Sequence, residues 1–86
     1  IKMKKYSRAL NLISGIELSP RVYNLRGFCY FGEKKYLLAA KEFNKAEMFE
    51  PDIIIYRRNR DIAYNKYKTT QQQLNKNLNY QRKLSK

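Results

Sequence analysis

Apolar side chains recur every three or four residues along most of this chain, the spacing that places them on one face of an α-helix. The clearest stripe lies between residues 35 and 50, and Lys41, Glu42 and Lys45 lie off it. Its members are Tyr36, Ala39, Ala40, Phe43, Ala46 and Phe49. With few glycines and no cluster of turn residues that would separate short strands, the pattern predicts an all-α fold.

Capping and breaking residues divide the pattern into about five predicted helices. The first spans residues 2–14 and ends before Gly15, and the second spans 20–31, with Ser19 as N-cap and Pro20 in the first turn. The third spans 35–50 and ends before Pro51. The fourth spans 53–67, is capped by Asp52, and offers five residues for burial. These are Ile54, Ile55, Ile62, Ala63 and Tyr67.

The end of the chain allows two interpretations. If Lys68, Thr69 and Thr70 break the helix, with Thr70 as a new cap, a fifth and mostly polar helix spans residues 71–84. The alternative is one continuous helix from Ile53 onward, which is long for a globular protein. We expect the interrupted form.

Eight residues between 20 and 53 stand at spacings typical of two closely packed helices. They are Tyr23, Gly27, Tyr30, Tyr36, Ala39, Phe43, Ala46 and Pro51. In type and order they resemble one 34-residue tetratricopeptide repeat, with Arg26 as a departure where that family prefers Leu. Gly27 and Ala39 would leave room at the helix crossing, and the aromatic rings would fill the space on either side.

The flanking segments resemble the family less closely. Tyr6, Ala9 and Leu10 resemble the start of the second helix of a preceding repeat within residues 1–19. Residues 54–86 are interpreted as a degenerate repeat or as capping helices with a basic tail, because Asp61 replaces the expected small residue. The resemblance therefore implies a single domain over residues 1–86, built as an α-solenoid of antiparallel helix–turn–helix units.

The resemblance also implies a concave groove lined by the first helices of successive repeats, which binds an extended peptide or a partner helix. Carried over by position, the groove holds Arg21, Asn24, Phe28, Phe31 and Gly32 from the matched repeat, and Ile55, Arg58, Ile62, Asn65 and Lys66 from the next. Arg and Asn suit a carboxylate and a peptide backbone, and Phe28 and Phe31 suit apolar anchoring. The alternative is that Phe28 and Phe31 only pack against a neighbouring helix.

The positive charge is concentrated at the C-terminal end. The chain has a net charge of +12, and residues 53–86 contain nine basic residues against one acid. A basic patch of Arg57, Arg60, Lys66 and Lys68 favours an acidic protein partner, the alternative being a solvated charged face. Nucleic-acid binding through this basic third, with interleaved tyrosines, is the second functional hypothesis. Association with an anionic membrane surface is a weaker third.

The sequence lacks the residues that several functional classes require. The chain contains no His, one Cys and three scattered Gly, so we expect no nucleophilic catalysis, no metal site, no phosphate-binding loop and no cofactor. Cys29 is interpreted as a small packed residue, which slightly favours a reducing, cytoplasmic compartment. No apolar run is long enough to span a membrane.

Together these observations predict a protein–protein interaction scaffold, such as a chaperone-like adaptor within a larger complex. Two and a half repeats bury little surface, so we expect more chain, a homo-oligomer or a stable protein partner.

Overall fold

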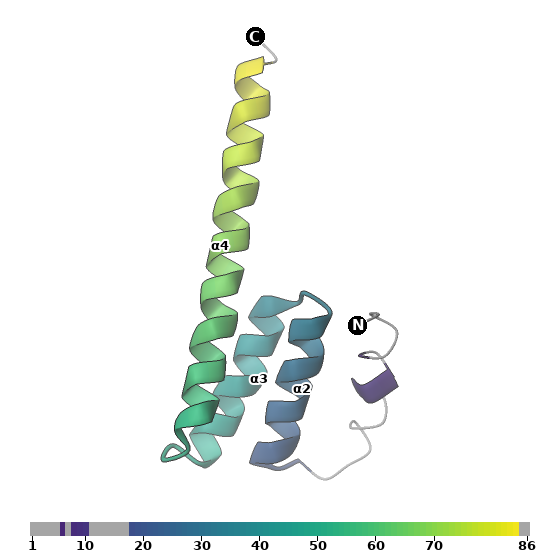
Figure 1. The fold of residues 1–86 in the computed structure, drawn as a ribbon, viewed down its shortest axis with the longest axis vertical. Coiled ribbons are helices and arrows are strands. Elements are labelled where there is room, and N and C mark those ends of the chain that lie inside the picture. The colour runs from purple at the N-terminus through teal and green to yellow at the C-terminus, as the bar shows by residue number, and fades with distance from the viewer. Residues whose placement is uncertain (1–5, 7, 11–17, 85–86) are drawn as a thin grey trace.

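The computed structural model describes residues 6, 8–10 and 18–84, and within them it contains helices and no strand. Three long helices follow one another: α2 (Pro20–Gly32), α3 (Tyr36–Phe49) and α4 (Ile54–Leu84) (Figure 1). The all-helical prediction is confirmed. Of the first predicted helix, residues 6 and 8–10 are helical, and the rest of 2–14 lies outside the described residues.

Both ends of α2 follow from local backbone chemistry. Ser19 is the N-cap as predicted: its hydroxyl accepts a hydrogen bond from the Val22 amide at 3.3 Å, and Pro20 opens the helix. At the other end Lys34 adopts a left-handed conformation with φ 64°. The Lys34 amide donates to the Phe31 carbonyl and the Lys35 amide donates to the Tyr30 carbonyl, both at 2.9 Å. This is a Schellman motif, and it turns the chain sharply into α3.

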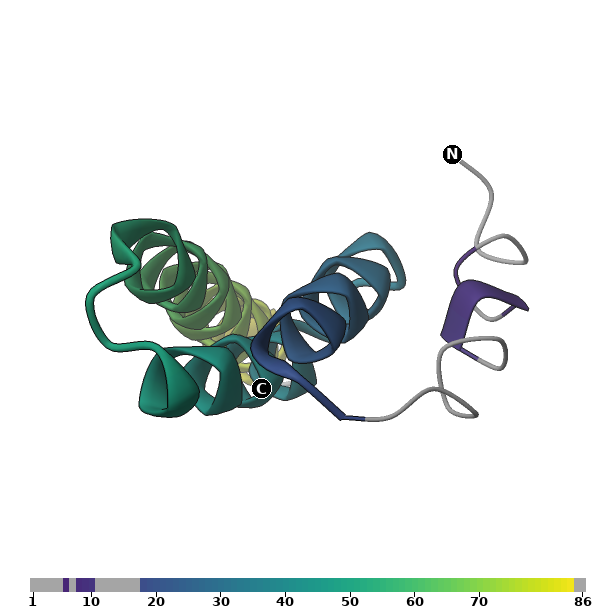
Figure 2. The same ribbon diagram turned by 90° about the horizontal axis from the view of Figure 1, so that it is seen from below.

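Helix α3 lies between α2 and α4 and packs against both, whereas α2 and α4 contact each other little (Figures 1 and 2). Most of the predicted stripe on α3 is buried: Ala39 and Ala46 are fully buried, and Phe43 is 2% exposed. Two expectations are wrong: Phe49, the last residue of α3, is 62% exposed and only stacks on Tyr23, and Glu42, predicted to lie off the stripe, is buried. Ala63 of α4 completes the core, and Tyr30 and Phe31 of α2 pack against it. Antiparallel packing of successive helices is thus present, as the sequence pattern predicts.

The crossing of α2 and α3 is close because Gly27 faces the ring of Phe43. A methyl group built on Gly27 would lie 2.5 Å from Cδ1 and 2.8 Å from Cζ of that ring, nearer than real contacts allow. The space left by glycine is therefore occupied by the most deeply buried large side chain. The predicted role of Gly27 at the crossing agrees with this geometry.

Arg26, the departure from the family pattern, forms an ion pair across the same interface. Its Nε lies 3.3 Å from Oε2 of Glu42, whose side chain is only 8% exposed. Lys45 approaches the other oxygen of Glu42 at 3.2 Å. A leucine at position 26 would leave Glu42 of α3 with Lys45 alone.

The predicted break after Tyr67 is wrong, because α4 is one helix of 31 residues. Thr69 and Thr70 are incorporated into the helix: their hydroxyls donate to the carbonyls of Asn65 and Lys66 at 2.9 and 2.8 Å. Threonine can bond to the preceding turn in this way as well as cap a new helix. As a result the second half of α4 projects far beyond α2 and α3 (Figure 1).

The buried face of α4 also differs from the prediction. Tyr56, Asn59 and Ala63 face α3, whereas three isoleucines expected to be buried are 47–60% exposed. Those residues are Ile54, Ile55 and Ile62. Asp52 lies in the turn two residues before Ile54, where α4 begins, so the residue immediately before the helix is Ile53 and not the predicted cap.

Candidate functional site

An apolar hollow lies between α2 and α4, where both helices rest on α3. It encloses about 120 Å³ and is lined by Phe28, Phe31, Phe43, Asn59 and Ile62. Its floor is the buried ring of Phe43. Phe28 on one wall and Ile62 on the other are each about half exposed, at 50% and 52%. Three predicted groove residues, Phe28, Phe31 and Ile62, are therefore brought together from separate helices.

The aromatic wall of the hollow is held by ring contacts. Phe28 meets Phe43 edge to face with ring centres 5.3 Å apart, and Phe31 meets Tyr36 in the same way at 5.0 Å. Edge-to-face pairs contribute about 0.5–1.5 kcal/mol beyond the burial of area. The two interpretations of Phe28 are thus compatible, because one part of the ring packs and another part faces solvent.

A side-chain amide pair joins α2 and α4, and one of its members, Asn59, lines the hollow. Asn59 Nδ2 donates to Oδ1 of Asn24 at 3.0 Å, and Asn59 is only 9% exposed. Asn24, predicted to bind a partner, is therefore engaged within the chain. Sequence reasoning missed Asn59, although a polar residue between Tyr56 and Ala63 on the buried stripe of α4 was a usable signal, because buried amides need partners.

The remaining predicted groove residues lie outside the lining of the hollow. Four of them are exposed: Arg21, Ile55, Arg58 and Asn65. Arg58 precedes Ile62 by four residues and Arg21 precedes Phe28 by seven, so each lies on the same helix face as a wall residue. These two guanidinium groups place positive charge on both helices that flank the hollow. Gly32, in contrast, lies against the ring of Tyr6 rather than in the hollow.

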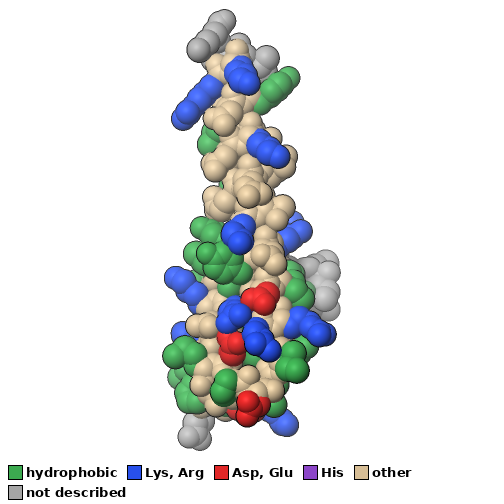
Figure 3. Space-filling model, turned by 90° about the vertical axis from the view of Figure 1, so that its left-hand side faces the viewer, with side chains coloured by type: hydrophobic (Ala, Val, Ile, Leu, Met, Phe, Trp, Pro, Cys, Tyr) green, Lys and Arg blue, Asp and Glu red, His purple; other side chains and the backbone are tan. Residues whose placement is uncertain are grey.

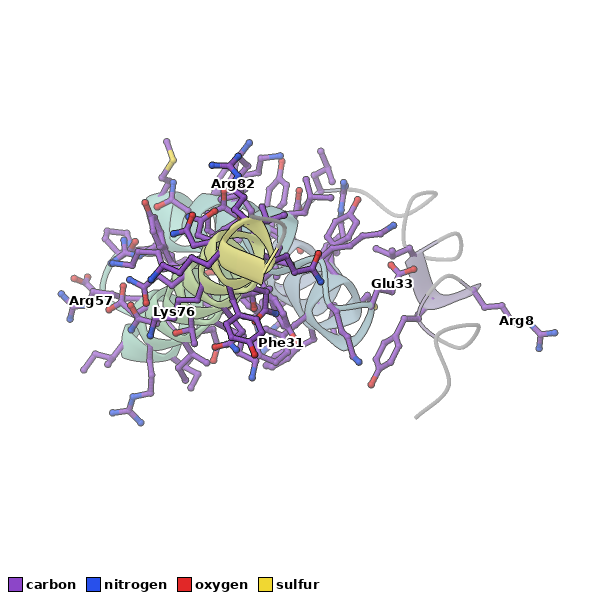
Figure 4. All side chains as sticks on the ribbon, turned by 90° about the horizontal axis from the view of Figure 1, so that it is seen from above. Arg8, Phe31, Glu33, Arg57, Lys76 and Arg82 are labelled. Atoms are coloured by element: carbon purple, nitrogen blue, oxygen red, sulfur yellow. The ribbon has the colours of Figure 1, made fainter. Side chains whose placement is uncertain are left out.

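The predicted basic patch is divided in the structure. Arg60 forms ion pairs with Glu47 of α3 and with Asp61. Lys66 lies over the ring of Tyr36 at 5.9 Å, and Lys68 lies over the ring of Tyr64 at 5.0 Å. Arg57 is exposed and points outward on the side of α4 away from α2 (Figure 4). The four residues therefore do not converge on one binding surface.

The acidic residues that the structure describes all lie in α3, the turns beside it and the first half of α4. Glu33, Glu42, Glu47 and Asp61 all lie within 4.0 Å of a Lys or Arg nitrogen. Most of these ion pairs join two helices or lie within a turn. The excess positive charge is left on α4, whose upper part shows Lys and Arg but no acid on the face seen in Figure 3. A field of this sign attracts acidic groups.

Cys29 is a buried free thiol on α2. Burial raises its pKa above the ordinary value of 9.0, and the nearby Glu33 carboxylate raises it further. Because the thiolate is the reactive form, this environment suppresses nucleophilic chemistry. The packing agrees with the interpretation of Cys29 as a small core residue.

In comparisons with known proteins, no family model, curated protein or solved structure matches the chain. Among the described residues, no helix combines the length and the apolar character needed to cross a bilayer; α4 is long enough but strongly polar.

Proposed function

We propose that this chain is a protein–protein interaction module that binds a peptide or helix of an acidic partner in the hollow between α2 and α4. We further propose that α2 and α3 form a tetratricopeptide-like repeat and that α4 continues the array. The observation that supports both is the hollow itself, which joins Phe28, Phe31 and Ile62 over a buried Phe43.

The chemistry of the hollow suits a side chain of such a partner. Its lining is mostly apolar, with Asn59 as the polar member, and half-exposed Phe28 and Ile62 offer area that an apolar anchor would cover. Aromatic and aliphatic pockets with positive charge nearby are typical binding hot spots for acidic partners. Arg21 and Arg58 would then meet the carboxylates that flank the anchor.

Selection from a displayed library of random 12-residue peptides tests this proposal on the full chain. We expect enriched peptides to combine one or two large apolar residues with Asp or Glu. The substitution Ile62→Glu should weaken their binding at least tenfold, because it places a carboxylate inside the hollow.

The matched control is Leu38→Glu, because Leu38 is 44% exposed on α3, lies outside the lining of the hollow, and gives the same charge change. The control should retain binding within twofold. Equal loss in both variants, or no enrichment of acidic peptides, would remove the proposal. Stronger binding of a single-stranded 20-nucleotide RNA, with no effect of Ile62→Glu, would favour nucleic-acid binding instead.

A further inference from the structure

The projecting half of α4 is the largest feature that the hollow leaves unexplained. We call residues 68–84 the α4 shaft; it contains 17 of the 31 residues of the helix. Every described side chain from 68 to 83 is exposed. Neither α2 nor α3 reaches beside its upper part (Figure 1).

An apolar stripe continues up the shaft from the core. Leu74 and Leu78 follow Tyr67 by seven and eleven residues, which is close to two and three whole turns of helix. They therefore extend the line of buried Tyr56 and Ala63 and of half-buried Tyr67, which lies beside Leu37 of α3. Leu74 is 51% and Leu78 is 55% exposed. The face of α4 that α3 covers in the first half of the helix is therefore uncovered in the shaft.

The composition of the shaft does not stabilise a lone helix. No acid follows Asp61, so the shaft lacks the ion pairs between residues four apart that support exposed helices. Its polar residues are mainly Gln and Asn, and Asn is a poor helix former. Isolated helices of about this length are marginal in water, and most helices are stabilised by packing of an apolar face. A covering partner would supply that packing.

The charge of the shaft favours an acidic partner over a second copy of the chain. The shaft contains four basic residues and no acid: Lys68, Lys76, Arg82 and Lys83. Two shafts of the same chain would bring like charges together, which opposes pairing with a second copy. Arg82 follows Leu78 by four residues and so lies beside the stripe. Lys76 and Arg82 project in different directions (Figure 4), and Lys76, two residues from both Leu74 and Leu78, lies on the side of α4 opposite the stripe.

From these observations we propose that the shaft is a second docking surface, which takes an acidic amphipathic helix of a partner protein. The apolar face of that helix would cover Leu74 and Leu78, in the position that α3 takes beside the lower half of α4. Its Glu and Asp residues would meet the basic side chains of the shaft. This surface is separate from the hollow and does not depend on it.

Binding of two synthetic helical peptides to the full 86-residue chain tests the proposal. Both peptides have 18 residues with Leu at the a and d positions of a heptad; one bears Glu and the other Lys at the outward positions. Fluorescence anisotropy should show binding of the Glu peptide only, weakened by raising the salt from about 50 to 300 mM. The double substitution Leu74→Gln and Leu78→Gln should weaken binding at least tenfold.

A matched pair on another face, Asn75→Gln and Asn79→Gln, should leave binding within twofold, and circular dichroism verifies that each variant is helical. Because the hollow is also proposed to take acidic peptides, the titrations are repeated on Ile62→Glu, where the tenfold loss caused by Leu74→Gln and Leu78→Gln should persist, which separates this surface from the hollow. Undiminished binding by the leucine variant, or equal binding of the Lys peptide, would overturn the proposal. So would a concentration-dependent dimer that the leucine variant abolishes, or preferential binding of a 20-nucleotide RNA that the variant retains.

Discussion

Replacing Gly27 with alanine tests whether one backbone contact sets the distance between α2 and α3. The added methyl group would overlap the ring of Phe43, at 2.5 Å from Cδ1 and 2.8 Å from Cζ. That ring is 2% exposed and is also in edge-to-face contact with Phe28, so it has little room to retreat. Either the ring or the whole of α2 must move.

Two opposing effects set the magnitude. Overfilling a packed core costs about 1–3 kcal/mol. Alanine in the interior of a helix is favoured over glycine by about 1 kcal/mol. Because contacts of 2.5 and 2.8 Å are a severe overlap, the overfilling here costs about 2–3 kcal/mol, and after the gain in helix propensity we expect Gly27→Ala to lower the free energy of unfolding by about 1–2 kcal/mol. For a chain of this size that corresponds to a fall in Tm of about 5–15 °C.

Thermal and urea unfolding, followed by circular dichroism at 222 nm, measure this change. A double-mutant cycle assigns it to the contact: Phe43→Leu removes ring atoms that the methyl group meets, so the pair should lose at least about 0.5 kcal/mol less than the sum of the single losses. If Gly27→Ala were as stable as the parent chain, or if the two losses simply added, the close crossing of α2 and α3 would not depend on glycine.

Three further substitutions probe separate features of the fold. Lys34→Gly should raise the free energy of unfolding by about 0.5–1 kcal/mol, measured by urea denaturation, because glycine adopts the left-handed conformation at low cost. Arg26→Ala should lower it by about 1–3 kcal/mol, since Glu42 is left buried with one cation; adding Glu42→Leu should restore most of the loss in the same assay. Cys29 makes unfolding pH-dependent: its folded pKa is raised, so its contribution is present below the ordinary pKa of 9.0 and is lost as pH rises above it. The parent chain should therefore lose more stability between pH 8 and 10 than Cys29→Ala, in parallel urea titrations.

Rules that relate residues a few positions apart were sufficient to predict the main features of α2 and α3. The Ser19 cap, the stop before Pro51 and the buried stripe around Phe43 each depend on residues a few positions apart, and each is present in the structure. The need for a small residue at Gly27 followed from the same helix-pair pattern, although the pattern placed the ring of Phe43 to the side of the crossing and not against Gly27. These features are predictable because neighbouring residues determine them.

The errors concern α4, where local signals were ambiguous. Thr69 and Thr70 are compatible with a cap and with bonding to the preceding turn, and sequence spacing cannot choose between the two. Ile62 is as apolar as any core residue, yet it faces the hollow because Ala63 takes the place beside α3. Which of two adjacent residues is buried depends on the rotation of the whole helix.

The candidate site was predicted only in part, because some of its contacts join residues that are far apart in the sequence. Phe28, Phe31 and Ile62 came from family-like positions and do line one hollow. Asn24 was assigned to a partner because its own partner, Asn59, is 35 residues away in sequence and on a different helix. Ion pairs such as that of Arg60 with Glu47 escaped prediction in the same way. Pairings between distant helices appear only once the chain is folded.

The amide pair of Asn24 and Asn59 has one more effect. Because α2 and α4 contact each other little, this hydrogen bond joins two helices that are otherwise held together mainly through α3, and it opposes sliding of one past the other. A slide of one turn, about 5.4 Å, would leave the buried amide of Asn59 without its partner at a cost of about 1–3 kcal/mol. A ligand in the hollow that bonded to Asn59 would compete with Asn24, so occupancy of the hollow and alignment of the two helices would be coupled through the same pair of side chains.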